Sequence, residues 1–232
     1  MTADSQNLMH NDRLVTVRFK RMKTIRLTVK PPEGELVVSA PIGTPLATLQ
    51  RFIDGQAAWI AKHQQRLQAL PAKPVLRYED GETHVLWGAC LPLQLVEGKG
   101  RQYVRQGDGL MQVHIAPNST IAQRKALMEA FYRDELRRVA QPMMEALADK
   151  MAVVPNRLFV QRMKTRWGSC NISKGNIRLN TELARKPQEV LEMVVVHELV
   201  HLLERNHTNR FYGLMDRFLP DWRARDAQLT AI

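Results

Sequence analysis

The stretch VVVHELVHLL, residues 194–203, constrains the fold more than any other part of this chain, because it sets polar groups into an apolar run. On a helix each residue advances about 100°, which places His201 about 40° around from His197 and one turn along, with Glu198 about 60° further. Two imidazoles and a carboxylate then share one face. The β-branched run 194–196 weakens helix propensity, so local preference alone leaves helix and strand close.

This face has the composition of a metal site. Two histidines at positions i and i+4 supply half of the tetrahedral ligand set that zinc prefers, and the adjacent carboxylate is placed to act as a base. The alternative is that the two histidines have this spacing by chance and are satisfied by core hydrogen bonds or water. An HExxH match is expected by chance about once per hundred such chains. The apolar surroundings favour the metal site, because unpaired polar groups there would be costly to bury.

A third histidine extends the pattern. His207 lies six residues after His201 and directly after Asn206, a residue type that tolerates the left-handed conformation that ends helices. A turn there would bring His207 back to the other two, whereas the alternative leaves it in a surface loop. The spacing HExxHxxxxxH therefore predicts three nitrogen ligands and an open fourth position, as in catalytic zinc sites.

The first half of the chain contains two sets of strand-like patterns separated by a helical one. Alternation at 14–19, 25–29 and 35–40 predicts a small antiparallel meander, and further strands are expected at 84–88, 91–96, 102–106 and 110–115. Between the sets, apolar residues recur at helical spacing from Pro45 to Leu70, with Gly55 dividing two helices. We expect a flexible leader at 1–12 and a strand-rich region with a helical pair at 13–116.

The second half begins with a long helical pattern. Ser119 or Thr120 is a suitable N-cap, and Pro142 is expected to kink or split the helix. Strands at 157–163 and 165–170, a hairpin around 173–176 and a helix opened by Pro187 follow.

The formal net charge of +11 favours polyanionic partners such as nucleic acid, nucleotides, acidic lipid or acidic protein. Seven Lys or Arg lie between Arg13 and Lys30 with no acid, and eight lie between Arg157 and Lys186 with one acid, Glu182. These runs are either solvated strand faces or anion-binding surfaces, and both interpretations stay open.

The two cysteines, Cys90 and Cys170, suit free thiols in a reducing compartment. The N-terminus has neither the basic start nor the apolar core of a signal peptide, and no apolar run approaches the ~20 residues of a membrane span. We therefore expect a soluble cytoplasmic protein without a membrane partner.

Several stretches in a fixed order resemble the YgjP-like zinc metallopeptidase family, with a distant likeness to the SprT and WLM zincins. They are MKTRWGSCN (163–171), GNIRLN (175–180), VVVHELVHL (194–202), NHTNRFY (206–212), LPDW (219–222) and, near the N-terminus, KRMKTIRLTV (20–29). The resemblance implies that His197, His201 and His207 carry the metal and Glu198 the proton. The metzincins share this spacing, but the glycine that follows their second histidine is Glu204 here.

The resemblance and the patterns together predict an α+β fold. In it, the N-terminal antiparallel strand-rich region precedes a zincin-like metallohydrolase domain at 117–232, with the HExxH stretch as its active-site helix. In zincins the strand before this helix often pairs with extended substrate, so Arg166 and Trp167 are candidate substrate contacts. The alternative is that Trp167 belongs to the core. Cys170 is interpreted as structural, since three histidines already suffice for the metal.

These residues predict a zinc-dependent hydrolase, with Zn²⁺ activating water and Glu198 as the general base. A peptide bond is the first expected substrate. An alternative is hydrolysis of nucleoside triphosphates, because basic flanks would hold phosphate although no P-loop is present. A third hypothesis is a protease associated with nucleic acid through its basic strands, for which no reader motif is visible.

Overall fold

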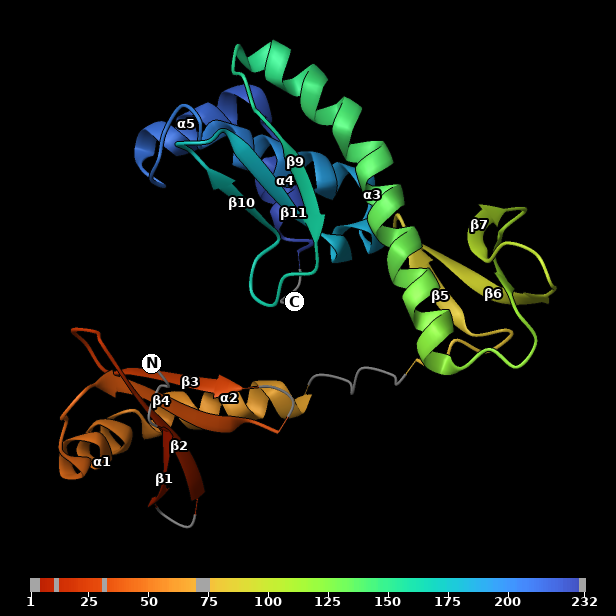
Figure 1. Cartoon of the computed structure of the whole chain (residues 1–232). Coiled ribbons are helices and arrows are strands. Elements are labelled where there is room, and N and C mark those ends of the chain that lie inside the picture. The colour runs from red at the N-terminus through yellow and green to blue at the C-terminus, as the bar shows by residue number, and fades with distance from the viewer. Residues whose placement is uncertain (1–4, 11–12, 31–32, 70–75, 230–232) are drawn as a thin grey trace. The chain divides into compact units, whose positions relative to one another are not determined.

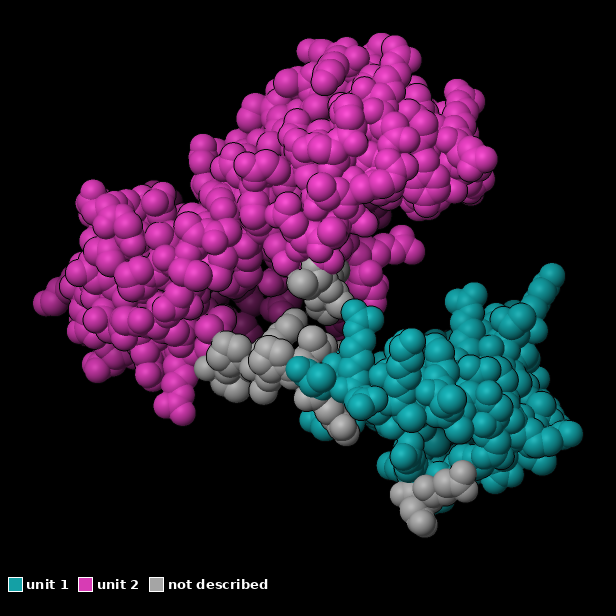
Figure 2. Space-filling view, turned by 180° about the vertical axis from the view of Figure 1, so that it is seen from behind, with its two compact units in different colours: residues 1–75 teal, residues 76–232 magenta. Residues whose placement is uncertain are grey.

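The computed structural model describes residues 5–10, 13–30, 33–69 and 76–229. It divides into two compact units, residues 1–75 and 76–232 (Figure 2). We expected a boundary between residues 116 and 117. The strands at 83–115 instead share one hydrophobic core with the long helix that follows them, so they belong to the second unit.

The first unit is a four-stranded sheet with two helices. Its elements are β1 (Ser5–His10), β2 (Arg13–Lys20), β3 (Arg26–Lys30), β4 (Glu35–Pro41), α1 (Leu46–Gly55) and α2 (Ala57–Ala69). The helices cover one face, where the core consists of Val15, Val17, Leu36, Val38, Ala40, Leu49, Ile53 and Ile60.

The strand order of this sheet is β1-β2-β4-β3, with β2 parallel to β4. The expected antiparallel meander is therefore wrong: β3 lies beyond β4, and the sheet is mixed. Apolar alternation predicts which side chains face the core but not which strands are neighbours. The expected flexible leader is also wrong for Ser5–His10, which pairs with β2; the rest of that leader, 1–4 and 11–12, lies outside the described residues.

The second unit begins with another four-stranded sheet and a long helix. These elements are β5 (Thr83–Leu86), β6 (Ala89–Glu97), β7 (Tyr103–Gly107), β8 (Leu110–Ile115) and α3 (Ile121–Met151). Thr120 caps α3 through a capping box with Gln123. Helix α3 continues through Pro142, so of the two expected outcomes, a kink or a split, the split is wrong; the buried residues Ala140 and Met144 hold both sides of Pro142 in the core. Figure 1 shows α3 passing from this sheet to the next one.

The remaining elements surround the HExxH helix. They are β9 (Leu158–Gln161), β10 (Gly168–Asn171), β11 (Asn176–Asn180), a 3-10 helix (Thr181–Arg185), α4 (Gln188–Val200), α5 (Asn209–Phe218) and α6 (Trp222–Asp226). The sheet order is β10-β11-β9, so β10 is an edge strand and forms the predicted hairpin with β11. Helix α4 is apolar on nearly all sides because α3 and this sheet both pack against it.

The expected α+β class is confirmed by these layers of sheet and helix. Both cysteines are free. Within the described ranges, no helix is long and apolar enough to cross a membrane.

Candidate metal centre

Two of the three histidines come from the end of α4 and the third from the turn that follows. Helix α4 ends at Val200, and His201 is its C-cap with helical dihedral angles. The backbone N–H groups of Leu203 and Glu204 then donate to the Val200 carbonyl, which continues the helical turn past the end of α4. The chain then bends at Arg205 and Asn206, and Asn206 is not among the described residues with positive φ, so the expected left-handed residue is not what turns the chain.

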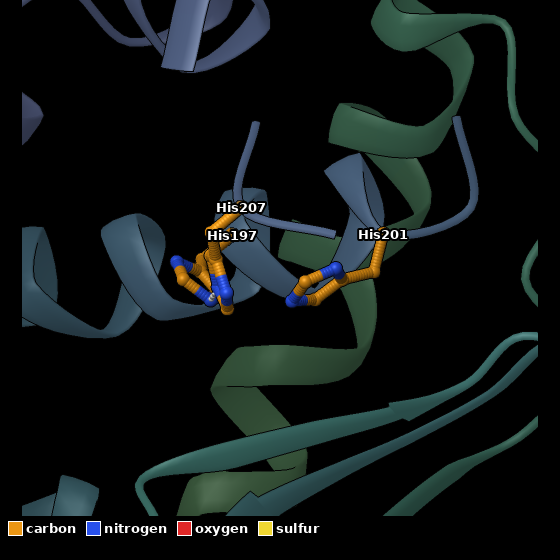
Figure 3. Close-up of side chains that lie close together, drawn as sticks. All are labelled: His197, His201 and His207. Atoms are coloured by element: carbon orange, nitrogen blue, oxygen red, sulfur yellow. Dashed lines mark hydrogen bonds between the residues drawn. The ribbon is translucent and has the colours of Figure 1, made fainter. Parts of the chain in front are cut away.

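The turn brings His207 against the two helical histidines. One nitrogen from each imidazole lies within 4.8 Å of the others, and His207 Nε2 is 3.0 Å from His197 Nε2. Figure 3 shows the three rings with their nitrogens facing one another. This is the only such cluster of His, Cys, Asp or Glu found within the described residues.

Phe211 supports all three rings from α5. Its ring centroid lies 4.9 Å from that of His197, 4.8 Å from His201 and 4.6 Å from His207, and its side chain is fully buried. Thr208 caps α5 by accepting a hydrogen bond from the Phe211 N–H. The sequence stretch NHTNRF (206–211) therefore supplies the candidate ligand His207, the helix cap Thr208 and Phe211, whose ring packs against the three histidines.

The protonation of the imidazoles suits metal binding. Burial lowers the pKa of His197 to about 4, with smaller effects from His201 and His207, and burial also lowers the pKa of His201. The lowered pKa values keep the rings of His197 and His201 neutral at pH 7, the form that binds metal. His201 Nδ1 donates to the Glu204 carbonyl at 3.3 Å, which leaves Nε2 free to coordinate. The donor set fits a divalent transition metal.

Glu198 lies outside this nitrogen cluster and faces strand β10. Its side chain is buried, with 5% of the residue exposed, and a Cβ built on Gly168 would lie 2.8 Å from its Cγ and 2.9 Å from its Cδ. Burial raises the pKa of Glu198 to about 8, and the charge of Arg166 acts in the opposite direction. Gly168 thus leaves the room that the carboxylate occupies, a relation that the sequence analysis missed.

The family profile described as YgjP-like, metallopeptidase domain, matches residues 23–231, nearly the whole chain. The chain belongs to the YgjP-like family. The resemblance inferred from the motifs is thereby confirmed, and it places this YgjP-like chain among the metal-dependent hydrolases.

A curated relative covers a smaller part. The protein of Escherichia coli (strain K12) called UTP pyrophosphatase is 33% identical over 92 residues, which are 39% of this YgjP-like chain. The match spans about half of that relative, 55% of its length.

Two solved structures are similar over 38% of this chain. The metallopeptidase zymogen abylysin of Pyrococcus abyssi has 19% identity and a TM-score of 0.35, with 86% of it covered. The zymogen jannalysin of Methanocaldococcus jannaschii has 16% identity and a TM-score of 0.34, with 94% covered.

A cleft of about 1110 Å³ opens over the three histidines of the YgjP-like chain. Arg166 and Trp167, the candidate substrate contacts, both line it. Arg166 is exposed, whereas Trp167 is half-buried against the core and Lys186 Nζ lies 5.5 Å from the centroid of its ring. Cys170 also lines the cleft, and burial, followed by the charge of Glu198, raises the pKa of its thiol to about 11.

Asn180 anchors the loop that carries these contacts, and sequence reasoning did not identify it. The side chain is fully buried; its Nδ2 donates to the carbonyls of Met163 at 2.9 Å and Arg166 at 2.8 Å. Its Oδ1 accepts from the N–H groups of Met163 and Glu182, and its own N–H donates to the Trp167 carbonyl. The available signal was an Asn at the end of the strand pattern GNIRLN, where it can cap the next turn.

The start of α4 is held by the β5–β6 turn. The Trp87 N–H donates to the Ala184 carbonyl at 2.8 Å, and a Cβ on Gly88, whose φ is +83°, would lie 3.2 Å from Pro187 Cγ. Trp87 Nε1 also donates to Glu135 of α3 at 3.0 Å. This turn therefore connects the first sheet of the unit to the helix that carries His197.

Proposed function

We propose that this chain is a zinc-dependent hydrolase with Glu198 as its general base and peptides as its first expected substrate. The observation that carries the proposal is the arrangement of three imidazoles beside the separate, buried carboxyl group of Glu198. Three nitrogen ligands suit zinc and leave a position for water or substrate, as catalytic sites require.

The chemistry divides between the metal and the chain. A bound Zn²⁺ would lower the pKa of a water molecule and polarise the oxygen of the bond to be cleaved. Burial alone would keep Glu198 mainly protonated at pH 7, and the positive charge of a nearby bound metal would favour its ionised form. As a carboxylate, Glu198 accepts the proton that the water loses and returns it to the leaving group. Gly168 leaves space for the carboxylate, and Phe211 holds the imidazole rings in place. Glu198 lines the cleft but is only 5% exposed, which limits its contact with bulk water.

A peptide substrate is supported by the edge strand. Strand β10 pairs with β11 on one side, and its outer side offers backbone groups to an extended chain. Gly168 on this strand faces Glu198, so a peptide paired there would pass beside the proposed base. Arg166 and Trp167 directly precede the strand and are proposed to contact the substrate. The family description as a metallopeptidase domain agrees with this substrate.

Nucleoside triphosphates are the second candidate substrate. Arg166, Arg178 and Arg205 line the cleft, and guanidinium groups bind phosphate oxygens through paired hydrogen bonds. The relative called UTP pyrophosphatase supports the same reading. Glu198 would serve as base in either reaction, because water attacks carbon in one and phosphorus in the other.

A parallel assay of both substrate classes tests the proposal. Zinc-loaded full-length chain is incubated with an unfolded polypeptide and, separately, with each common nucleoside triphosphate. Peptide fragments support the first substrate, and release of phosphate or pyrophosphate supports the second. Either activity should disappear with a chelator and return with zinc. Absence of both activities in metal-loaded protein, or activity that survives complete metal removal, would overturn the proposal.

A further inference from the structure

Strand alternation sorts the basic run at 13–30 between the two faces of the β1–β4 sheet. On β2, Val15 and Val17 point toward the helices, so Arg18 and Lys20 point to the opposite face. On β3, Leu27 packs against the core, and Arg26 therefore also lies on the opposite face. Arg13 is the exception, because its guanidinium donates to Gln64 of α2 on the helix side.

The register brings these cations into one row. Arg18 pairs with Ser39 of β4, and Ser39 pairs with Arg26 of β3. Two strand spacings of about 4.8 Å separate the two arginines, so their Cα atoms lie roughly 10 Å apart, with Ser39 and its hydroxyl between them. Lys20 is two residues further along β2, and Arg21 and Lys23 follow in the connection to β3. We call Arg18, Lys20, Arg21, Lys23 and Arg26 the basic face.

The basic face is not neutralised within the fold. No acid occurs between Arg13 and Lys30, and residues 1–75 contain eleven Lys and Arg against five Asp and Glu. Among the described residues, the ion pairs of this unit join His10 to Asp54 and Lys30 to Glu35, and none includes a member of the basic face. The charges are therefore available to an external anion.

The form of the surface selects the class of anion. The cations spread over an open strand face, whereas the two best-defined cavities of the described residues are lined by the second unit, so an extended polyanion fits better than a small one. The hydroxyls of Thr28 and Ser39 lie on the same face and can donate to phosphate oxygens, whereas the Thr16 hydroxyl donates to Glu35 Oε1 at 3.1 Å. Phe19 points to the core side, and no described residue of the open face is aromatic, so bases have no ring on which to stack.

We propose that the basic face binds nucleic acid through its backbone phosphates, without sequence preference. The inference does not depend on the reaction in the cleft, because it rests on the first unit alone. Phosphates repeat along an extended strand as the cations repeat across this sheet, and binding through them releases counterions and weakens with salt.

Affinity measurements with the zinc-loaded full chain test this proposal. Fluorescent single-stranded RNA, single-stranded DNA and duplex DNA of mixed sequence are titrated at about 50 and about 200 mM salt. The double variant Arg18→Glu/Arg26→Glu should lose about tenfold or more in affinity, and its salt slope should fall by about 1.4 for single strands, about 0.7 for each lost contact.

The matched control is Arg51→Glu/Arg66→Glu, which makes the same change in net charge on exposed positions of α1 and α2. It should lose less than about threefold. Equal losses in both double variants, or none in the first, would overturn the assignment to this face. Polyglutamate that competes as well as nucleic acid would overturn the choice of partner. Thermal unfolding checks that each variant is folded, and Arg18→Gln/Arg26→Gln repeats the test without charge reversal.

Discussion

The two units contain basic sheets that place their polar residues in opposite ways. In the β1–β4 sheet the cations lie on the face that the helices leave uncovered, and Arg18 and Arg26 have no ion pair among the described residues. In the β9–β11 region the important polar groups are buried: Asn180 is fully enclosed and Glu198 is 5% exposed between α4 and β10.

The difference teaches which polar residues carry chemistry. A solvated cation interacts weakly with the fold, so replacing it changes binding to other molecules more than stability. A buried amide or carboxylate is held by specific neighbours, and removing either partner disturbs the other. In this chain the candidate reaction centre is therefore better indicated by burial within an apolar helix than by net charge.

The largest expected contrast between the units is in metal content. His197→Ala or His201→Ala should empty the site, and His207→Ala should weaken it, because each removes one of three nitrogen ligands. Elemental analysis of purified protein measures this directly. The double variant Arg18→Glu/Arg26→Glu should keep about one metal per chain, as should the unchanged protein. Full occupancy in all three histidine variants would rule out this metal centre.

The second contrast concerns glycines in open and closed surroundings. Gly168→Ala should lower turnover roughly 10²-fold or more, because its Cβ would occupy the space of the Glu198 carboxylate. Gly213→Ala in α5 is the control, since nothing lies within 4 Å of a Cβ there, and it should raise stability by up to about 1 kcal/mol. Steady-state kinetics measures the turnover, and denaturant unfolding measures the stability. Normal turnover in Gly168→Ala would show that the Glu198 carboxylate can move without loss of activity.

Much of this architecture follows from sequence patterns. Alternation predicts the strands of both units, and the i, i+4 spacing predicts the shared face of His197 and His201. The turn that returns His207 also follows, although Asn206 does not adopt the left-handed conformation. These features depend on residues close in sequence, for which periodicity is informative.

The parts that sequence analysis missed depend on contacts between distant segments. The parallel pairing of β2 with β4 joins strands separated by β3, and local alternation does not encode strand order. Gly168 lies against Glu198, which is thirty positions later in the sequence. The Phe211 ring likewise contacts the ring of His197 from another helix. A polar segment such as Ser5–His10 becomes a strand because β2 offers an edge.

A third, smaller contrast compares a buried and an exposed asparagine. Asn180→Ala should destabilise the fold by about 2–3 kcal/mol, because buried backbone groups of the 163–166 loop lose their partners. It should also raise KM if this loop positions substrate. Asn156→Ala removes one exposed hydrogen bond to the Lys174 carbonyl and should cost less than about 1 kcal/mol. Similar unfolding free energies for the two variants would contradict the anchoring role.

The smallest expected effect is a pH dependence at the turn that holds α4. The Arg138 guanidinium, and to a lesser degree the Trp87 indole Nε1–H, lower the pKa of Glu135 against the opposing effect of burial. Because the folded-state pKa lies below the unfolded one, this carboxylate contributes stability above its unfolded pKa, and the contribution disappears as pH falls through the folded pKa. Glu135→Gln should therefore flatten the acid side of the stability curve. Thermal unfolding across that range measures it, and an unchanged curve would contradict the assignment.

The central claim is that three histidines hold the metal while Glu198 moves the proton. Its most direct test is to measure zinc content and turnover together in Glu198→Gln, which keeps the size of the side chain and removes its basicity. We predict full zinc occupancy, an unchanged fold and a loss in turnover of roughly 10²–10⁴-fold, the scale of a general base. Loss of zinc together with activity would make Glu198 a ligand or an anchor, and unchanged turnover would remove it from the reaction.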